Sequence, residues 1–196
     1  MHNAPATADR PAPSLLRDVR YTIVPHQLRG VSAGLAALDL EANPGALVMP
    51  DRGENAVRHE ELVAYTRPVI CVAAMHCRSL LQFLGVDCGD GAAMDVATDA
   101  TSEAAPDIWI GTFDGRNGRR LEPVPLSVLE RFGDSQRVQH AWTATARFAA
   151  QALVDAMNDP ALIDGTLAPM LRRTFETVPD VVNRWFYERA VLVANR

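Results

Sequence analysis

The sequence predicts an α+β protein, with a small mixed β-sheet covered by helices and a C-terminal region of three helices. Val69–Met75 (VICVAAM) is apolar on both alternating faces, as expected for a central strand that is covered on two sides. Further short apolar runs occur before residue 125, and helical periodicity replaces them from residue 126 onward. Because doubly covered strands are typical of parallel sheets, an α/β arrangement is the alternative.

The length of 196 residues predicts one domain with a real hydrophobic core. Residues 1–14 are rich in proline and alanine, which predicts a disordered tail. Residues 15–196 are then expected to form a single α+β domain, sheet-rich over 20–125 and helical over 126–196.

Several segments are expected to be strands, because they are short, apolar and bounded by turn residues. They are residues 21–24, 46–49, 69–75, 92–97, 108–113 and 119–124. The sequence DGRNG at 114–118 predicts a hairpin between the last two, since its glycines can take positive φ. Residues 56–65 fit a helix and a strand equally well.

Two helices are expected to cover this sheet. Apolar residues recur at three- and four-residue steps over 27–40, and Gly30 and Gly34 would let a neighbouring backbone approach that helix closely. Residues 78–85 suit a short helix, which Gly85 is placed to end in the left-handed conformation.

Three further helices are expected in the C-terminal region. They are residues 135–158, residues 167–178, which end before Pro179, and a helix that begins with Asp180 as N-cap. The last helix carries Trp185, Phe186 and Tyr187 within one turn, more aromatic side chains than one helix face can bury. These three residues are therefore candidates for binding a protein partner or a second copy of the chain.

Composition argues against several classes of partner. The formal net charge is -5 and no basic tract occurs, which does not favour nucleic acid. The longest apolar run is well short of the roughly 20 residues that a membrane-spanning helix needs. Since the N-terminus also lacks the charged start and apolar centre of a signal peptide, a soluble, cytoplasmic protein is expected.

All nineteen basic residues are arginine, so mechanisms that need a lysine amine are excluded. Among these are a Walker phosphate loop and a pyridoxal-phosphate Schiff base, and no cofactor is expected. Zinc is considered because Cys71, His76, Cys77 and Cys88 lie close in sequence. Adjacent residues on a strand point to opposite faces, however, so His76 and Cys77 would not share one ion, and no metal site is predicted.

Cys77 is the candidate nucleophile. In the predicted fold it lies where a strand ends and a helix begins, and the N–H groups and dipole of a helix N-terminus lower the pKa of a thiol. The run CRSLLQFLGV from Cys77 to Val86 resembles the local pattern of transglutaminase-like and papain-like enzymes, in which a helix begins at the cysteine and runs into a leucine-glycine turn. In that family a histidine and an acid follow on adjacent strands.

The resemblance implies a hydrolase or acyltransferase with a histidine base and an orienting acid. His140, in the tripeptide His140-Ala141-Trp142, is the candidate base, with His59 and His76 as alternatives. Asp107 is the candidate acid, with Asp95 and Asp99 as alternatives. The sequence thus leaves two hypotheses: a non-catalytic interaction or regulatory protein that uses its C-terminal helices, and a cysteine-nucleophile enzyme.

Overall fold

The computed structural model describes residues 11–43, 59–87, 95–96, 108–155, 163 and 165–191. Its helices are α1 (Pro13–Asp18), α2 (Val24–Ala42), α3 (His59–Phe83), α4 (Ser135–Asp155) and α5 (Leu167–Val182). Two π-helical turns, η1 (Val19–Ile23) and η5 (Asn183–Tyr187), join α1 to α2 and extend α5, and 3-10 turns lie at η3 (Ile110–Thr112) and η4 (Leu126–Phe132). The strands β1 (Val86–Asp87) and β2 (Asp95–Val96) form one short antiparallel pair.

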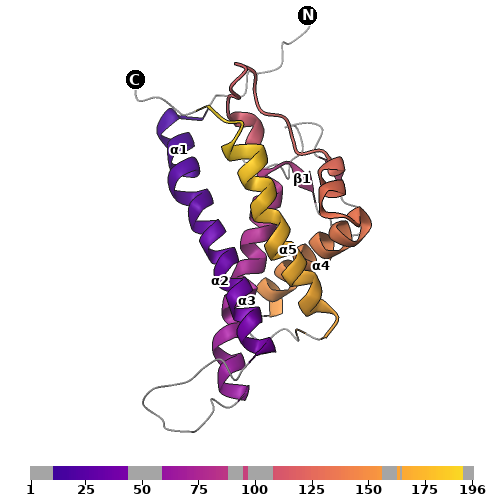
Figure 1. The fold of residues 1–196 in the computed structure, drawn as a ribbon. Helices are drawn as coiled ribbons and strands as arrows, with labels where there is room; N and C mark the ends of the chain where they lie inside the picture. The colour runs from indigo at the N-terminus through magenta and orange to yellow at the C-terminus, as the bar shows by residue number, and fades with distance from the viewer. Residues whose placement is uncertain are drawn as a thin grey trace, which may run out of the picture.

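α3 is the central helix of the molecule. The rod formed by α1, η1 and α2 runs down one side of it, and α5 and α4 lie on the other (Figure 1). α3 contacts α2, α4 and α5, and its inward side chains are buried at three- and four-residue steps. These are Ile70, Ala73, Ala74, Cys77, Leu80 and Leu81, and the buried Leu84 follows directly after the helix. The core of the protein is therefore assembled around one helix.

The prediction of a β-sheet core was wrong. Val69–Met75, the expected central strand, lies within α3, and residues 21–24 fall in η1 and the start of α2. Within the described ranges, sheet is confined to the β1–β2 pair, so neither the α+β nor the α/β arrangement is present. The physical reason is that an apolar run without alternation suits a buried helix as well as a buried strand. Of the other expected strands, residues 46–49 lie outside the described part of the chain.

The turn predictions were better than the strand predictions. Gly85 follows α3 with φ of 79°, which confirms that it ends this helix. At the predicted hairpin, Asp114 and Arg120 form an isolated β-bridge, the Gly115 N–H donates to the Arg119 carbonyl at 2.6 Å, and Gly118 has φ of 74°. Glycine is needed at such positions because side chains disfavour positive φ.

The helix predictions were confirmed in place but not in every boundary. α2 contains the expected 27–40 helix and α4 begins at the expected Ser135. α5, however, continues through Pro179 to Val182 and into η5, so Asp180 is not an N-cap. Burial of Val178, Val181 and Val182 on both sides of the proline holds the helix together, because tertiary packing supplies most helix stability.

Gly30 and Gly34 allow the close approach of α2 and α3 that the sequence predicts. A Cβ on Gly34 would overlap the Cβ of Ala73 and would lie 3.0 Å from Cε2 of Phe175. A Cβ on Gly30 would overlap the ring of His76. The two glycines therefore set the distance between the helices and place α3 against α2.

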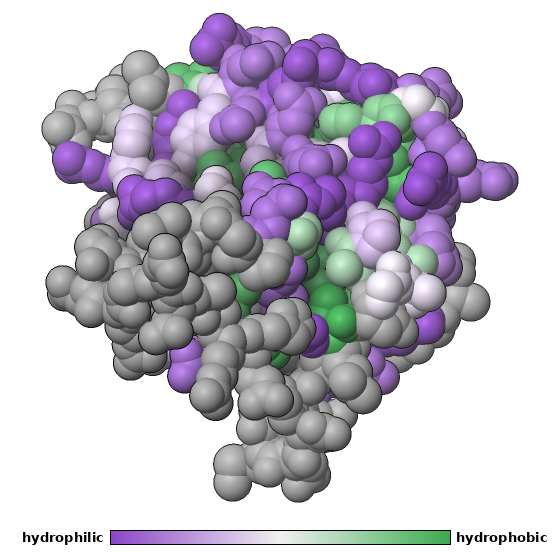
Figure 2. Space-filling view, turned by 60° about the horizontal axis from the view of Figure 1, so that its bottom comes forward, coloured by the Kyte–Doolittle hydropathy of each residue, from purple (hydrophilic) through white to green (hydrophobic). Residues whose placement is uncertain are grey.

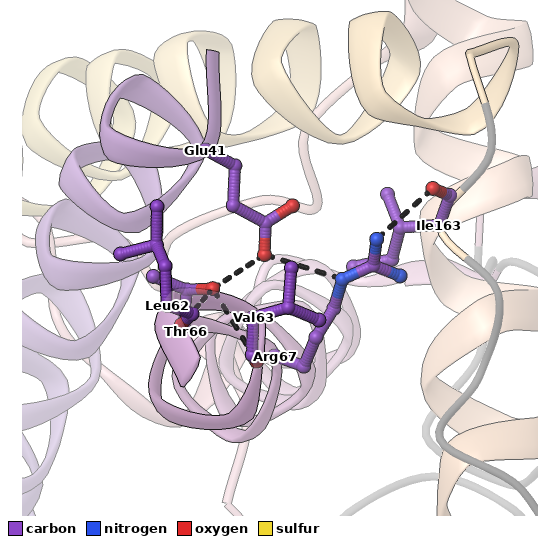
Figure 3. A network of polar contacts seen from close by, with 6 residues as sticks. All are labelled: Glu41, Leu62, Val63, Thr66, Arg67 and Ile163. Carbon is purple, nitrogen blue, oxygen red and sulfur yellow. Dashed lines mark hydrogen bonds and ion pairs between the residues drawn. The ribbon is translucent and has the colours of Figure 1, made fainter. Parts of the chain in front are cut away.

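Polar contacts fix the lower ends of α2 and α3 (Figure 3). Glu41 Oε1 accepts hydrogen bonds from Thr66 Oγ1 at 2.5 Å and from Arg67 Nε at 3.2 Å. Arg67 Nη2 also donates to the carbonyl of Ile163 at 3.3 Å. One carboxylate thus ties α2 to α3, and one guanidinium ties α3 to the segment before α5.

Buried threonines fasten α4 to α5. Trp142 Nε1 donates to Thr177 Oγ1 at 2.8 Å, and Thr145 Oγ1 donates to Thr174 Oγ1 at the same distance. Trp142 and both partners of the second bond are fully buried. Satisfied polar pairs of this kind specify one arrangement of two helices, because an unpaired buried donor is unfavourable.

Candidate functional site

The structure does not give Cys77 the environment that the sequence predicts. Cys77 lies inside α3 and not at a helix N-terminus, because α3 begins at His59. Its side chain is fully buried, and burial raises the pKa of the thiol far above its ordinary value. A thiol in such surroundings stays protonated and is a poor nucleophile.

The structure does not bring the proposed base and acid to Cys77. His140 is exposed on α4, whereas Cys77 has no exposed surface. Asp107 and Asp99 lie outside the described residues, as do the side chains of His59 and Asp95. In the described part of the chain, no three His, Cys, Asp or Glu side chains gather closely enough to hold a metal ion.

The three aromatic residues predicted to bind a partner largely face inward. Phe186 is fully buried, with its ring centroid 4.8 Å from that of Phe113. Trp185 Nε1 donates to the Glu122 carbonyl at 3.3 Å, and the guanidinium carbon of Arg189 lies 3.5 Å from the centroid of a Trp185 ring. Tyr187 is half-buried. The π-helical turn η5 therefore distributes these side chains over the core and the adjoining hairpin.

An apolar surface is exposed on α3 instead. Tyr65, Val69 and Val72 are 76%, 38% and 47% exposed, and their four- and three-residue spacing places them on one side of the helix. We call these three residues the α3 face. The chain has no charged residue from Pro68 to Cys77. Figure 2 turns the lower end of the molecule forward and shows apolar surface open between polar regions there.

A pair of histidines lies beyond the upper end of the α3 face. The ring centroids of His26 on α2 and His76 on α3 are 5.5 Å apart and nearly perpendicular. Burial, and to a lesser degree the charge of His26, lower the pKa of His76. Gln27 Nε2 donates to Ser79 Oγ beside this pair at 2.8 Å. Protonation of His76 is thus disfavoured in the folded protein.

A buried cation occupies the place where η1 meets η5. Arg20 is only 5% exposed, and its guanidinium carbon lies 5.5 Å from the ring centroid of Phe186 and 5.7 Å from those of Tyr21 and Tyr187. We call Arg20 with these three aromatic residues the Arg20 site. π-helical turns are rare and occur often at functional sites. Here two of them, far apart in sequence, meet around one charged side chain.

The hydrogen bonds of Arg20 are incomplete. Nη1 donates to the Val191 carbonyl at 3.1 Å, and the Tyr187 hydroxyl donates to the Arg20 carbonyl at 2.9 Å. Nε is buried and has no hydrogen-bond partner within the described residues. The ion pairs of the described residues do not include Arg20. The five donors of this guanidinium therefore meet one acceptor among the residues that the structure describes.

The sequence analysis predicted neither the Arg20 site nor the α3 face. The Arg20 site was missed because residues 21–24 were expected to be a strand, and because its partners lie on η5 at the other end of the chain. The sequence did contain a signal for the α3 face. The run from Pro68 to Cys77 carries no charge and spans more than two helix turns, so a helix there has an apolar side wherever no other element covers it.

Comparison of the chain with models of known protein families, with characterised proteins and with solved structures gives no match. No helix in the described ranges is both long and apolar enough to cross a lipid bilayer. The described residues define the class: a helical protein that exposes an apolar face on its central helix and buries, at one end, an arginine without an ion-pair partner among them.

Proposed function

We propose that this chain is a non-catalytic interaction protein that pairs with a second copy of itself through the α3 face. The observation that carries the proposal is the exposure of Tyr65, Val69 and Val72 on one side of a helix. Exposed contiguous apolar surface marks interaction sites, and tyrosine is among the residues that contribute most to binding. The surface lies on α3 and not on the C-terminal helices, because η5 turns its aromatic residues inward.

The lack of charge on the α3 face favours a second copy as the partner. The chain has no charged residue from Pro68 to Cys77, so an identical uncharged face can cover it without burying a charge. Two α3 helices would then pack antiparallel about a two-fold axis. Antiparallel packing also opposes the helix dipoles, and two-fold dimers are the commonest oligomers.

The spacing of the α3 face suits this arrangement. Residues at steps of four and three are those that form the seam between two packed helices. With the two-fold axis between Val69 and Val72, Val69 of each copy packs against Val72 of the other, and Tyr65 covers the end of the seam. The cysteine-nucleophile alternative gains no comparable support, because Cys77 is buried inside the same helix.

Sedimentation equilibrium over about 1 to 100 μM protein tests the proposal, a range that brackets a micromolar dissociation constant. We expect the wild-type chain to reach twice its monomer mass and Val72→Asp to remain monomeric. Leu15→Asp is the matched control, because Leu15 is 43% exposed but lies on α1. A wild-type monomer throughout, or a dimer that persists in Val72→Asp, contradicts the proposal.

A further inference from the structure

We propose that the Arg20 site binds the carboxylate of a small molecule with an apolar body. This inference is independent of pairing through the α3 face. Arg20 lies in η1, and its aromatic contacts come from η1 and η5 and not from the α3 face. It begins from the buried guanidinium, whose Nε has no hydrogen-bond partner within the described part of the chain.

The electrostatics of the site call for an anion. A buried charge without a partner is strongly unfavourable, and buried charges in proteins are normally paired. The faces of Tyr21, Phe186 and Tyr187 offset only part of this cost, because a cation–π contact is weaker than an ion pair. The described residues place no carboxylate in ion-pair contact with Arg20. The site is thus complementary to a negative group.

The geometry of the guanidinium selects an oxyanion that can accept two parallel hydrogen bonds. Nη1 is already used by the Val191 carbonyl. Nε and Nη2 lie side by side on the remaining edge, and Nη2 makes no hydrogen bond with the described residues. This edge matches the two oxygens of a carboxylate, which is the usual bidentate partner of arginine.

The side chains around Arg20 favour a ligand whose carboxylate is attached to an apolar group. Tyr21, whose ring lies against the guanidinium, is 49% exposed. Ile23, two residues further along η1, and Val191, whose carbonyl accepts from Arg20 Nη1, are each 43% exposed. A ligand that displaces the Tyr21 ring would reach Nε and Nη2 of Arg20, and its apolar body would lie near these apolar side chains. A strongly hydrated anion such as phosphate would gain less here, because desolvation opposes its entry.

Isothermal titration calorimetry of the full chain with phenylacetate and phenylacetamide tests the proposal. The two probes have the same apolar body, but only the first carries a carboxylate. We expect phenylacetate to bind with a dissociation constant at or below about 1 mM and phenylacetamide to bind at least ten-fold more weakly. Inorganic phosphate should bind more weakly than phenylacetate. This comparison uses only the wild-type protein, so it does not depend on the folding of a variant.

Two variants then assign the binding to Arg20. Arg20→Met keeps the length of the side chain without its charge and should lose phenylacetate binding by at least ten-fold. Arg184→Met removes an exposed arginine of η5 that pairs with Asp180, and it should leave binding unchanged. Equal affinity for the two organic probes, tighter binding of phosphate, absence of phenylacetate binding at about 10 mM, or wild-type affinity in Arg20→Met would each overturn the proposal.

Discussion

The Arg20 site and the α3 face place charged and apolar side chains in opposite ways. Where η1 meets η5, a guanidinium is withdrawn from water among aromatic rings, whereas Tyr65, Val69 and Val72 of the central helix face solvent. Figure 1 places the η1–η5 end at the top of the molecule and the beginning of α3 at the bottom. At one region a buried donor has no hydrogen-bond partner among the described residues, and at the other the described residues leave apolar side chains uncovered. Polarity and exposure are thus reversed between the two regions, so a ligand that suited one would not suit the other.

The largest effect should distinguish the two sides of α3. Ile70 is fully buried and Val72 is 47% exposed, although they are two residues apart on one helix. We expect Ile70→Asp to lower the free energy of unfolding by about 4 kcal/mol or more, because it buries an unpaired carboxylate. Val72→Asp should change it by less than about 1 kcal/mol. Urea denaturation at low protein concentration measures both, and similar losses would mean that Val72 is not exposed.

A second effect concerns the α2–α3 contact between the two regions. We expect Gly34→Ala to lower the free energy of unfolding by about 1–3 kcal/mol, because the new Cβ would meet Ala73 and Phe175. Gly165→Ala is the matched control, since nothing lies within 4 Å of its added Cβ. Thermal denaturation of both variants would show whether the helices are as close as described. An unchanged midpoint for Gly34→Ala would mean that they are not.

The third effect tests whether the charge of Arg20 stabilises or destabilises the folded protein. In the absence of ligand, we expect Arg20→Met to raise the free energy of unfolding by about 1 kcal/mol, because an apolar side chain of similar length replaces a buried charge that no described carboxylate pairs with. Guanidinium-chloride denaturation is the measurement. A loss of more than about 2 kcal/mol would show that the hydrogen bond to Val191 and the aromatic contacts outweigh the burial of the charge.

The smallest effect is a pH dependence from His76. Its pKa in the folded protein lies below the ordinary value of 6.5, so the unfolded chain binds more protons near that pH. The stability should therefore be fully present above pH 6.5 and should decline as the pH falls below it. Chemical denaturation of wild type and of His76→Gln at several pH values isolates the change in the free energy of unfolding with pH that His76 causes. His140→Gln, which removes an exposed histidine on α4, is the control and should keep this change with pH.

The error in fold class arose at a particular segment. Val69–Met75 offers no alternation of polar and apolar residues, so its sequence pattern does not distinguish a helix from a strand. The hypothesis of a nucleophile depended on the same segment, since a strand there would have left Cys77 at a helix start. When the segment proved to be α3, Cys77 became a core residue.

Predictions made from single residues were more reliable than predictions of whether a segment is a helix or a strand. Gly85 and Gly118 were recognised as positions of positive φ, and Gly30 and Gly34 as points of close approach, because glycine reports on backbone geometry and on steric space directly. The Arg20 site had no local signal. Arg20 and Tyr187 are brought together only by packing of η1 against η5, and nothing in either stretch of sequence indicates the other.

The sequence by itself determined the helix periodicity of α2 and α4, the glycine turns and the central place of residues 69–75 in the fold. These properties depend on local sterics and on hydrophobicity, which each residue carries with it. Only the tertiary structure decided that residues 69–75 are helical, which side of α3 is left uncovered and which arginine is buried. Those outcomes depend on contacts between residues far apart in the chain, because burial is a property of the assembled core.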